Sequence, residues 1–274
     1  MRLSPTTTQR MAVVFMWALA AITLAASVLM QIVTNLENDV GYTERGGETG
    51  TRVGLPRATA NGWLRIDAVK KAVLLAIVTA WIVAMPLLRH AGWPVAAMGI
   101  GATLAAYSYM GGPRPIAYTP FGELMVFLFF GIVAVCGTFY VQTGTLRAEA
   151  MIAAAATGLL ASAVLLVNNT RDRDHDAGTG RRTLAVVLGR DGSMRVLALL
   201  LFLPFLLTTA LALEASSAWF ALPLAALPVA WRLHRDVART GSGPAMNTLL
   251  FRTVKLEVAF GALLTTGALA YTWA

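Results

Sequence analysis

Residues 148–176 of this chain read AEAMIAAAATGLLASAVLLVNNTRDRDHD, an apolar run that ends in a dense group of amides, acids and arginines. The apolar part, 148–168, has about the 20 residues that an α-helix needs to cross the hydrocarbon core of a bilayer. Asn168, Asp172 and Asp176 are four residues apart, so a helix that continues through them places all three on one face. We therefore expect a membrane-spanning helix that carries three oxygen-bearing side chains to the membrane boundary.

The composition of the whole chain is typical of a polytopic membrane protein. Of its 274 residues, 57% are hydrophobic and only 13% are charged, which is more apolar surface than a soluble fold of this size can bury. Backbone groups in lipid must be hydrogen-bonded within the segment, so the spans should be helices. We predict an all-α bundle with eight spans, at residues 11–34, 68–89, 93–110, 121–141, 148–168, 194–213, 216–231 and 249–273.

Lysine and arginine are unevenly distributed among the loops. Eighteen of the 22 lie in the four segments 35–71, 111–120, 169–195 and 232–255. Because cytoplasmic loops are enriched in these residues, the asymmetry predicts a multi-pass protein of the cytoplasmic (inner) membrane with these segments inside and both termini outside. It also explains the net charge of +8 without a nucleic-acid partner, and it suits a membrane surface and an anionic substrate.

A related polar motif follows the first span, where residues 35–39 read NLEND. Asn38 precedes Asn168 by 130 residues, and each lies at the same end of a predicted span. This spacing predicts two four-helix pseudo-repeats within a single domain that covers the whole chain. The first half would be residues 11–110 with motif one, and the second half 121–274 with motif two. The two motifs would face each other across a central cavity.

Two facing acidic motifs surrounded by arginines fit a diphosphate. Hard oxygen ligands suit Mg²⁺, which bridges carboxylates to phosphate oxygens, and arginine binds the remaining anionic oxygens. A diphosphate whose organic part lies in the membrane is a polyprenyl diphosphate, with its tail between the helices. Departure of the diphosphate leaves an allylic cation, which an electron-rich acceptor captures.

Taken together, these motifs resemble those of UbiA-type intramembrane prenyltransferases. Residues 168–176 and the segment GRRTLAV at 180–186 look like the second aspartate motif of that family. The segments GGPRPIAY at 111–118 and GTFYVQTG at 137–144, with NLEND at 35–39, are similar to the subgroup that prenylates 1,4-dihydroxy-2-naphthoate in menaquinone biosynthesis.

The resemblance implies transfer of a polyprenyl group to dihydroxynaphthoate with loss of its carboxylate, giving demethylmenaquinone, with Mg²⁺ as cofactor. The implied catalytic residues are Asp39, Asp172 and Asp176. The implied metal ligands are Asn38, Asp39, Asn168, Asp172 and Asp176. The expected contacts to the diphosphate or to the aromatic acceptor are Asn35, Arg45, Arg57, Tyr109, Tyr140, Arg171 and Arg181.

Two features depart from the family pattern. The pattern places an aspartate four residues after the motif-one asparagine, and this chain has Tyr42 there. A phenol with a pKa near 10 is a poor Mg²⁺ ligand at neutral pH, so Glu44 or Glu48 would have to substitute for the missing acid. Family members also carry a span before the motif-one helix, whereas this sequence starts on that helix.

Two further acids, Asp174 and Glu257, are not among the expected site residues. Asp174 lies off the helix face that carries Asp172 and Asp176, so we expect it to be solvated. Glu257 falls inside the last span, where an acid should pair with Lys255 or Arg252 or face a cavity.

Three other functions remain open at this level. The same chemistry could use a different acceptor, such as 4-hydroxybenzoate. Tyr42 suggests a degenerate, non-catalytic protein that binds isoprenoids or quinones. A transporter would explain charges at membrane level, but not why the acids cluster at helix ends beside basic loops.

Overall fold

The computed structural model describes residues 5–47, 53–241 and 243–273, and within these ranges it contains helices and no strand. This confirms the all-α prediction. Six long helices are α1 (Pro5–Glu44), α2 (Ile66–Ala91), α3 (Trp93–Met110), α6 (Ala148–Arg171), α8 (Leu184–Glu214) and α10 (Met246–Trp273). A further rod joins α4 (Gly122–Val126), the π-helical segment η2 (Phe127–Cys136) and α5 (Gly137–Thr143). The remaining segments are η1 (Ile116–Tyr118), α7 (Arg173–Gly178), η3 (Ala218–Ala226) and α9 (Leu227–Thr240).

Six helical stretches in the described chain are long and apolar enough to cross a membrane. They are Gln9–Glu44, Ile66–Ala91, Gly122–Thr143, Ala148–Arg171, Leu184–Glu214 and Met246–Thr272. The predicted count of eight is therefore not confirmed. The two extra spans correspond to α3, whose glycine, serine and tyrosine residues lower its hydropathy, and to the short pieces η3 and α9, the second of which carries three arginines.

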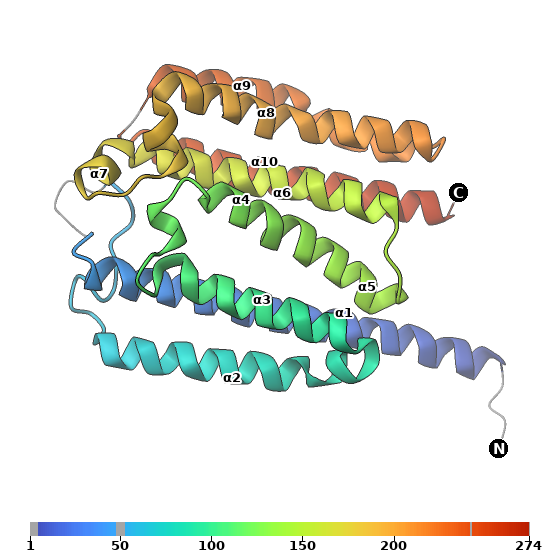
Figure 1. Ribbon diagram of the computed structural model, residues 1–274. Helices are drawn as coiled ribbons and strands as arrows, with labels where there is room; N and C mark the ends of the chain where they lie inside the picture. The colour runs from blue at the N-terminus through green and yellow to red at the C-terminus, as the bar shows by residue number, and fades with distance from the viewer. Residues whose placement is uncertain (1–4, 48–52, 242, 274) are drawn as a thin grey trace.

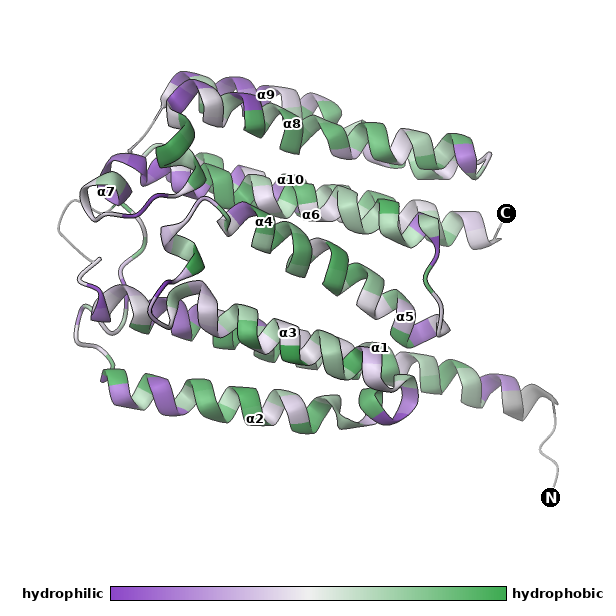
Figure 2. Ribbon diagram, viewed as in Figure 1, coloured by the Kyte–Doolittle hydropathy of each residue, from purple (hydrophilic) through white to green (hydrophobic). Residues whose placement is uncertain are grey.

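Hydrophobic residues make up most of the long helices (Figure 2). Large apolar side chains such as Trp17, Leu75 and Val258 are 66–73% exposed. A soluble protein does not expose this many large apolar groups, whereas a protein in lipid gains nothing by hiding them. The exposure therefore supports a lipid-facing surface and a multi-pass membrane protein.

The polar loops gather at one end of the bundle. Figure 1 draws α7 at this end, together with the ends of α1, α3 and α6 and the starts of α2 and α10. The beginning of α1 and the end of α10 lie at the opposite end. The four segments that together hold most of the lysine and arginine thus lie at one end, and the beginning of α1 and the end of α10 lie at the other, as the distribution of charge predicts.

The helices of the two halves pack mainly within their own half. The α1 helix packs against α2 and α3, and α6 packs against α8, η2 and α10. The largest apolar core lies in the second half and includes Leu166, Leu201 and Phe260. The two-fold pseudo-repeat with its boundaries at 11–110 and 121–274 stays a prediction.

The η2 segment and α6 cross with their backbones in direct contact. A Cβ atom added to Gly131 would lie 2.5 Å from the Cα of Gly158 and 2.7 Å from the carbonyl oxygen of Ala154. Small residues permit such close crossings between membrane helices, where dispersion forces rather than water drive association. This crossing fixes the α4–η2–α5 rod against the helix that carries motif two.

We expect Gly131→Ala to lower the free energy of unfolding by about 1–3 kcal/mol or more, because the backbones must separate to admit the methyl group. Gly261 on α10 is the matched control, since a Cβ there meets no atom within 4 Å. Gly261→Ala should instead stabilise the helix by up to about 1 kcal/mol. Thermal unfolding in detergent measures both, and shifts of the same sign would contradict the proposed close crossing.

Candidate active site

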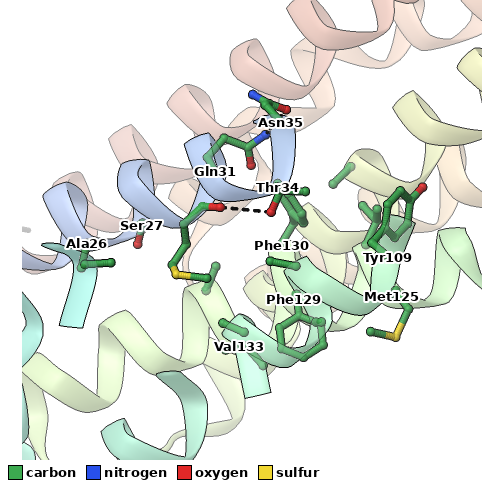
Figure 3. Close-up of a pocket in the computed structure, with 18 of the residues that line it drawn as sticks. Ala26, Ser27, Gln31, Thr34, Asn35, Tyr109, Met125, Phe129, Phe130 and Val133 are labelled. Atoms are coloured by element: carbon green, nitrogen blue, oxygen red, sulfur yellow. Dashed lines mark hydrogen bonds between the residues drawn. The ribbon is translucent and has the colours of Figure 1, made fainter. Parts of the chain in front are cut away.

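A cavity of about 890 Å³ lies among α1, α2, α3, the α4–η2–α5 rod, α6 and α10. Most of its wall is apolar, with Met30, Trp81, Phe129 and Leu250 among the lining residues; Figure 3 shows part of it. Its polar lining near the loop end of the bundle includes Asn35, Asn38, Arg57, Tyr109 and Asn168. The asparagines of both motifs therefore line one cavity, as the facing arrangement of the motifs predicts.

Motif two follows a nearly continuous helical path through the end of α6 and through α7. The backbone N–H of Asp172 donates to the carbonyl oxygen of Asn168 at 3.2 Å, and that of Asp176 donates to Asp172 at 2.8 Å. Asp172 itself has φ −93° and ψ 4°, which marks the junction between the two helices. The four-residue spacing in the sequence thus corresponds to successive helical turns.

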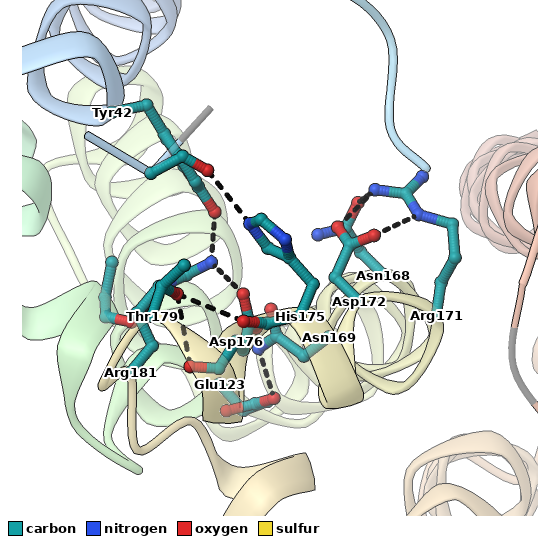
Figure 4. A network of polar contacts seen from close by, with 12 residues as sticks. Tyr42, Glu123, Asn168, Asn169, Arg171, Asp172, His175, Asp176, Thr179 and Arg181 are labelled. Atoms are coloured by element: carbon teal, nitrogen blue, oxygen red, sulfur yellow. Dashed lines mark hydrogen bonds and ion pairs between the residues drawn. The ribbon is translucent and has the colours of Figure 1, made fainter. Parts of the chain in front are cut away.

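Asp172 and Arg171 form a buried ion pair (Figure 4). Arg171 Nε donates to Oδ1 of Asp172 at 2.9 Å and Nη2 donates to Oδ2 at 2.6 Å, and the side chains are only 5% and 4% exposed. Arg171 also donates to the amide oxygens of Asn168 at 3.0 Å and of Asn247 at 2.8 Å. This arginine, an expected diphosphate contact, is therefore held by motif two and by α10.

Asp176 is fully buried and has one engaged and one unengaged oxygen. Its Oδ1 accepts a hydrogen bond from Arg181 Nη1 at 2.6 Å, while its Oδ2 has no hydrogen-bond partner among the described residues. Burial raises the pKa of this carboxyl above its ordinary value, and the charge of Arg181 opposes that effect. A buried carboxylate oxygen without a donor is a position that a cation can fill.

The glycine- and proline-rich loop 111–118 holds arginines from both halves through its backbone. Arg181 donates Nε and Nη2 to the carbonyl oxygen of Ala117 at 3.2 and 3.1 Å. Arg45 donates Nε to the carbonyl of Met110, at the end of α3, at 3.2 Å, and Nη2 to that of Gly112. Irregular backbone leaves carbonyl groups available as acceptors, which a continuous helix would not. This loop thus lies at the polar end of the bundle.

The carboxylate of Asp39 is engaged by the loop that follows α1. Its Oδ2 accepts from the N–H of Ala58 at 2.8 Å, and its Oδ1 accepts from the N–H of Thr59 at 2.9 Å and from the Thr59 hydroxyl. Three of the roughly four lone-pair sites of a carboxylate are thus used. Asp39 ties the loop to α1, whereas its neighbour Asn38 lines the cavity.

Tyr42 is buried, with 5% of its surface exposed, and it contacts two guanidinium groups. The guanidinium carbons of Arg57 and Arg181 lie 4.2 and 4.9 Å from the centroid of its ring. Its hydroxyl accepts a hydrogen bond from Arg181 Nη1. Neither proposed substitute for the missing acid is seen to complete the motif: Glu44 pairs with Lys70 of α2 at 2.5 Å, and Glu48 lies outside the described residues.

The remaining expected residues differ in whether they line the cavity. Asn35 and Tyr109 line the cavity. Tyr140 is not among the lining residues, although Thr138 and Val141 on the same helix α5 are. It lies about 25 Å along the helical rod from the start of the rod at the loop end. The structure therefore does not bring Tyr140 to the motifs.

The two further acids behave as predicted. Asp174 has a side chain that is 72% exposed and pairs with Arg173 at 3.1 Å. Glu257 lines the cavity, while Arg252, one of its two suggested partners, pairs with Asp236 at 2.9 Å.

The sequence did not reveal a buried polar pair behind motif two. Asn169 Nδ2 donates to Oε1 of Glu123 at 2.9 Å, and the backbone carbonyl of Glu123 accepts from the Ser162 hydroxyl at 2.8 Å. The sequence also did not reveal Asn247, at the start of α10, whose amide oxygen accepts a hydrogen bond from Arg171. The only signal for the pair is an acid at the start of an apolar span, which needs a partner in a membrane protein.

The oxygen atoms of motif two fit a divalent cation better than those of motif one do. No three acidic, histidine or cysteine side chains converge anywhere in the described ranges. Motif two offers the unengaged oxygen of Asp176 and the cavity-lining amide of Asn168. Motif one offers an amide, Asn38, and a carboxylate whose two oxygens both accept hydrogen bonds already.

Comparison with known sequences gives consistent matches over most of the chain. The model of the UbiA prenyltransferase family matches residues 10–256. The 1,4-dihydroxy-2-naphthoate octaprenyltransferase of Escherichia coli is 32% identical over 93% of this chain and 85% of that protein. The protein of the same name from Mycobacterium tuberculosis is 33% identical over 93% of this chain and 86% of its own length.

Two solved structures share the fold. A UbiA homolog from Aeropyrum pernix, in its apo form, superposes with a TM-score of 0.70 at 14% sequence identity and covers 90% of this chain and 89% of its own. A UbiA homolog from Archaeoglobus fulgidus, bound to DMAPP and Mg²⁺, gives 0.61 at 13% identity, with 90% and 88% covered. At these identities the likeness concerns the arrangement of the helices alone.

Proposed function

The chain belongs to the UbiA prenyltransferase family, and on that basis we propose that it transfers a polyprenyl group from polyprenyl diphosphate to 1,4-dihydroxy-2-naphthoate. The observation that carries this proposal is the shared cavity, in which the asparagines of both motifs line the polar end of a chamber with apolar walls. Such a chamber suits a ligand with a charged head and a long hydrocarbon tail. The names of the Escherichia coli and Mycobacterium tuberculosis relatives support the naphthoate as acceptor.

The donor would bind with its diphosphate at the loop end and its tail along the apolar wall. Arg57 lines the cavity, and Arg45 lies at the same end, fixed by two backbone carbonyls. Arginine binds phosphate oxygens through a planar fork of N–H groups, so these two side chains are suited to orient the head group. Arg171 and Arg181 would act through the acids that they hold in motif two.

Asn168, Asp172 and Asp176 would hold Mg²⁺ on the motif-two side. The pair with Arg171 uses only two of the roughly four lone-pair sites of the Asp172 carboxylate, and one oxygen of Asp176 has no hydrogen-bond partner among the described residues. When bound, the ion would neutralise the charge that develops on the departing diphosphate. The mostly apolar wall of the cavity would keep water from capturing the allylic group before the acceptor does.

The bond changes in this proposal balance without an added oxidant or reductant. The carbon–oxygen bond between the prenyl group and diphosphate breaks, and diphosphate leaves with the electron pair. The naphthoate carbon that bears the carboxylate forms the new carbon–carbon bond. Carbon dioxide then leaves, and its bonding electrons restore the aromatic ring, which gives a reduced demethylmenaquinone.

For the location, we propose the inner membrane with the motif end of the bundle in the cytoplasm. Support comes from the clustering of arginine-rich loops at one end, since such loops are retained on the cytoplasmic side. Polyprenyl diphosphate and the aromatic acid would then reach the site from the membrane and from the cytoplasmic face.

Parallel assays with two acceptors test this function. The purified chain in detergent or nanodiscs is incubated with Mg²⁺ and a polyprenyl diphosphate, with either 1,4-dihydroxy-2-naphthoate or 4-hydroxybenzoate, and the products are identified by mass spectrometry. We expect prenylated product from the naphthoate alone. Product from 4-hydroxybenzoate alone would change the acceptor, and binding of the diphosphate without any product would favour the non-catalytic function.

A further inference from the structure

Tyr42 connects the two motifs through arginine side chains. It lies on α1 in motif one, yet its hydroxyl accepts a hydrogen bond from Arg181, which in turn pairs with Asp176 of motif two at 2.6 Å. Its ring also contacts Arg57, a residue that lines the cavity, at 4.2 Å from the guanidinium carbon to the ring centroid. Tyr42 and Arg181 are 5% and 4% exposed, so water does little to weaken the contact between these two side chains.

Resting on the function proposed above, we propose that Tyr42 is a positioning residue. It acts on arginine side chains at the position where the family pattern has an aspartate. It holds Arg57 and Arg181 in place, so that the motif-one side of the site binds the diphosphate through arginine rather than through a second divalent cation. The enzyme then takes a single Mg²⁺, on the motif-two side.

The described acids near motif one are engaged elsewhere or do not line the cavity, so among the described residues little is left to hold a second ion. Both oxygens of Asp39 accept hydrogen bonds from the following loop, and Glu44 pairs with Lys70. Glu37 does not line the cavity and packs against Gly111. The phenol of Tyr42 is a weak ligand for a hard cation, and its oxygen already accepts from an arginine.

The aromatic ring of Tyr42 can hold an arginine in a way that an aspartate at this position cannot. A guanidinium stacks on an aromatic ring through its flat face, whereas it binds phosphate through the N–H groups at its edge. A tyrosine can therefore hold Arg57 without itself occupying that edge. A carboxylate at position 42 would take the same edge and compete with the substrate.

The experiment measures metal count and affinity rather than turnover. Binding of farnesyl S-thiolodiphosphate, a non-reactive donor analogue, to the full chain is followed by calorimetry with and without Mg²⁺. We expect one Mg²⁺ per protein in the complex and measurable binding in the presence of EDTA. Tyr42→Leu and Tyr42→Asp should each weaken the metal-free binding by about tenfold, and Tyr42→Phe, which keeps the ring, should retain most of it.

Two controls keep the result interpretable. Tyr271→Leu changes an exposed tyrosine near the end of α10, at the far end of the bundle, and should leave the metal-free affinity unchanged. Arg57→Lys keeps the charge but loses the flat face, so it should weaken metal-free binding even if the Leu variant does not fold.

Two outcomes would overturn the inference while leaving the proposed function intact. One is a complex with two Mg²⁺ ions, and the other is an unchanged metal-free affinity in the Tyr42→Leu, Tyr42→Asp and Arg57→Lys variants. Failure of the analogue to bind even with Mg²⁺ would instead contradict the proposed function itself.

Discussion

Asp176→Asn is expected to lower the rate of prenyl transfer by at least about a hundredfold, since the loss of several kcal/mol of stabilisation of a leaving diphosphate corresponds to that factor or more. Asp176 carries the one buried carboxylate oxygen of motif two that lacks a donor in the described chain. An amide has nearly the same shape but no negative charge, so it would bind a divalent cation poorly. The rate of product formation at saturating Mg²⁺ measures the effect.

Asp174→Asn is the matched control for this substitution. Asp174 lies two residues away in the same short helix, but its side chain is exposed and pairs with Arg173. Removing a solvent-exposed charge of this kind should change the rate less than about twofold. Equal losses in the two variants would mean that the general charge of α7, and not the buried carboxylate, supports the reaction.

The second large effect concerns the buried pair of Arg171 and Asp172. Asp172→Leu leaves the guanidinium of Arg171 buried without an anion, which should lower the free energy of unfolding by about 3–5 kcal/mol. Adding Arg171→Met removes the second charge as well, and most of the lost stability should return. Prenyl transfer should stay absent in the double variant, because motif two has then lost a carboxylate.

Thermal unfolding and product formation are measured on the unchanged protein, the Asp172→Leu variant and the double variant. Together they distinguish a structural role of the ion pair from a role of Asp172 in the reaction. If the double variant regains both stability and transfer, the pair is only a scaffold, and Asp172 has no part in binding the cation. If stability returns without transfer, Asp172 belongs to the reaction site.

The sequence predicts those parts of the fold that depend on local patterns. The spacing of Asn168, Asp172 and Asp176 is realised as successive helical turns, because the α6 path continues almost unbroken into α7. The uneven distribution of arginine predicts which loops share an end of the bundle. The number of spans is harder to predict, because α3 and the pieces η3 and α9 lie close to the limits of length and hydropathy for crossing a bilayer.

Side-chain pairing within the site could not be predicted in the same way. Adjacent residues on a regular helix point in different directions, so nothing in the sequence indicates that Arg171 pairs with Asp172. The pair forms because Asp172 lies at the junction between two helices and leaves the regular helical geometry. Tyr42 could be identified as a departure from the family pattern, but its partner Arg181 is 139 residues away.

The predicted substrate contact of Tyr140 stays a prediction. Its place in a motif similar to the family suggested a substrate contact, but the sequence does not show how far the α4–η2–α5 rod extends from the site. The rod runs the length of the bundle, and Tyr140 lies near its far end. A motif shared with a family therefore does not by itself place a residue at the reacting groups.

In the proposed reaction, this chain joins a polyprenyl group to dihydroxynaphthoate at the carbon that loses its carboxylate. The most direct test uses 1,4-dihydroxy-2-naphthoate labelled in its carboxyl group, with Mg²⁺ and a polyprenyl diphosphate. We expect labelled carbon dioxide and free diphosphate to appear in equal amounts, together with an unlabelled prenylated product. Diphosphate released without labelled carbon dioxide, or a prenylated product that keeps the label, would contradict it.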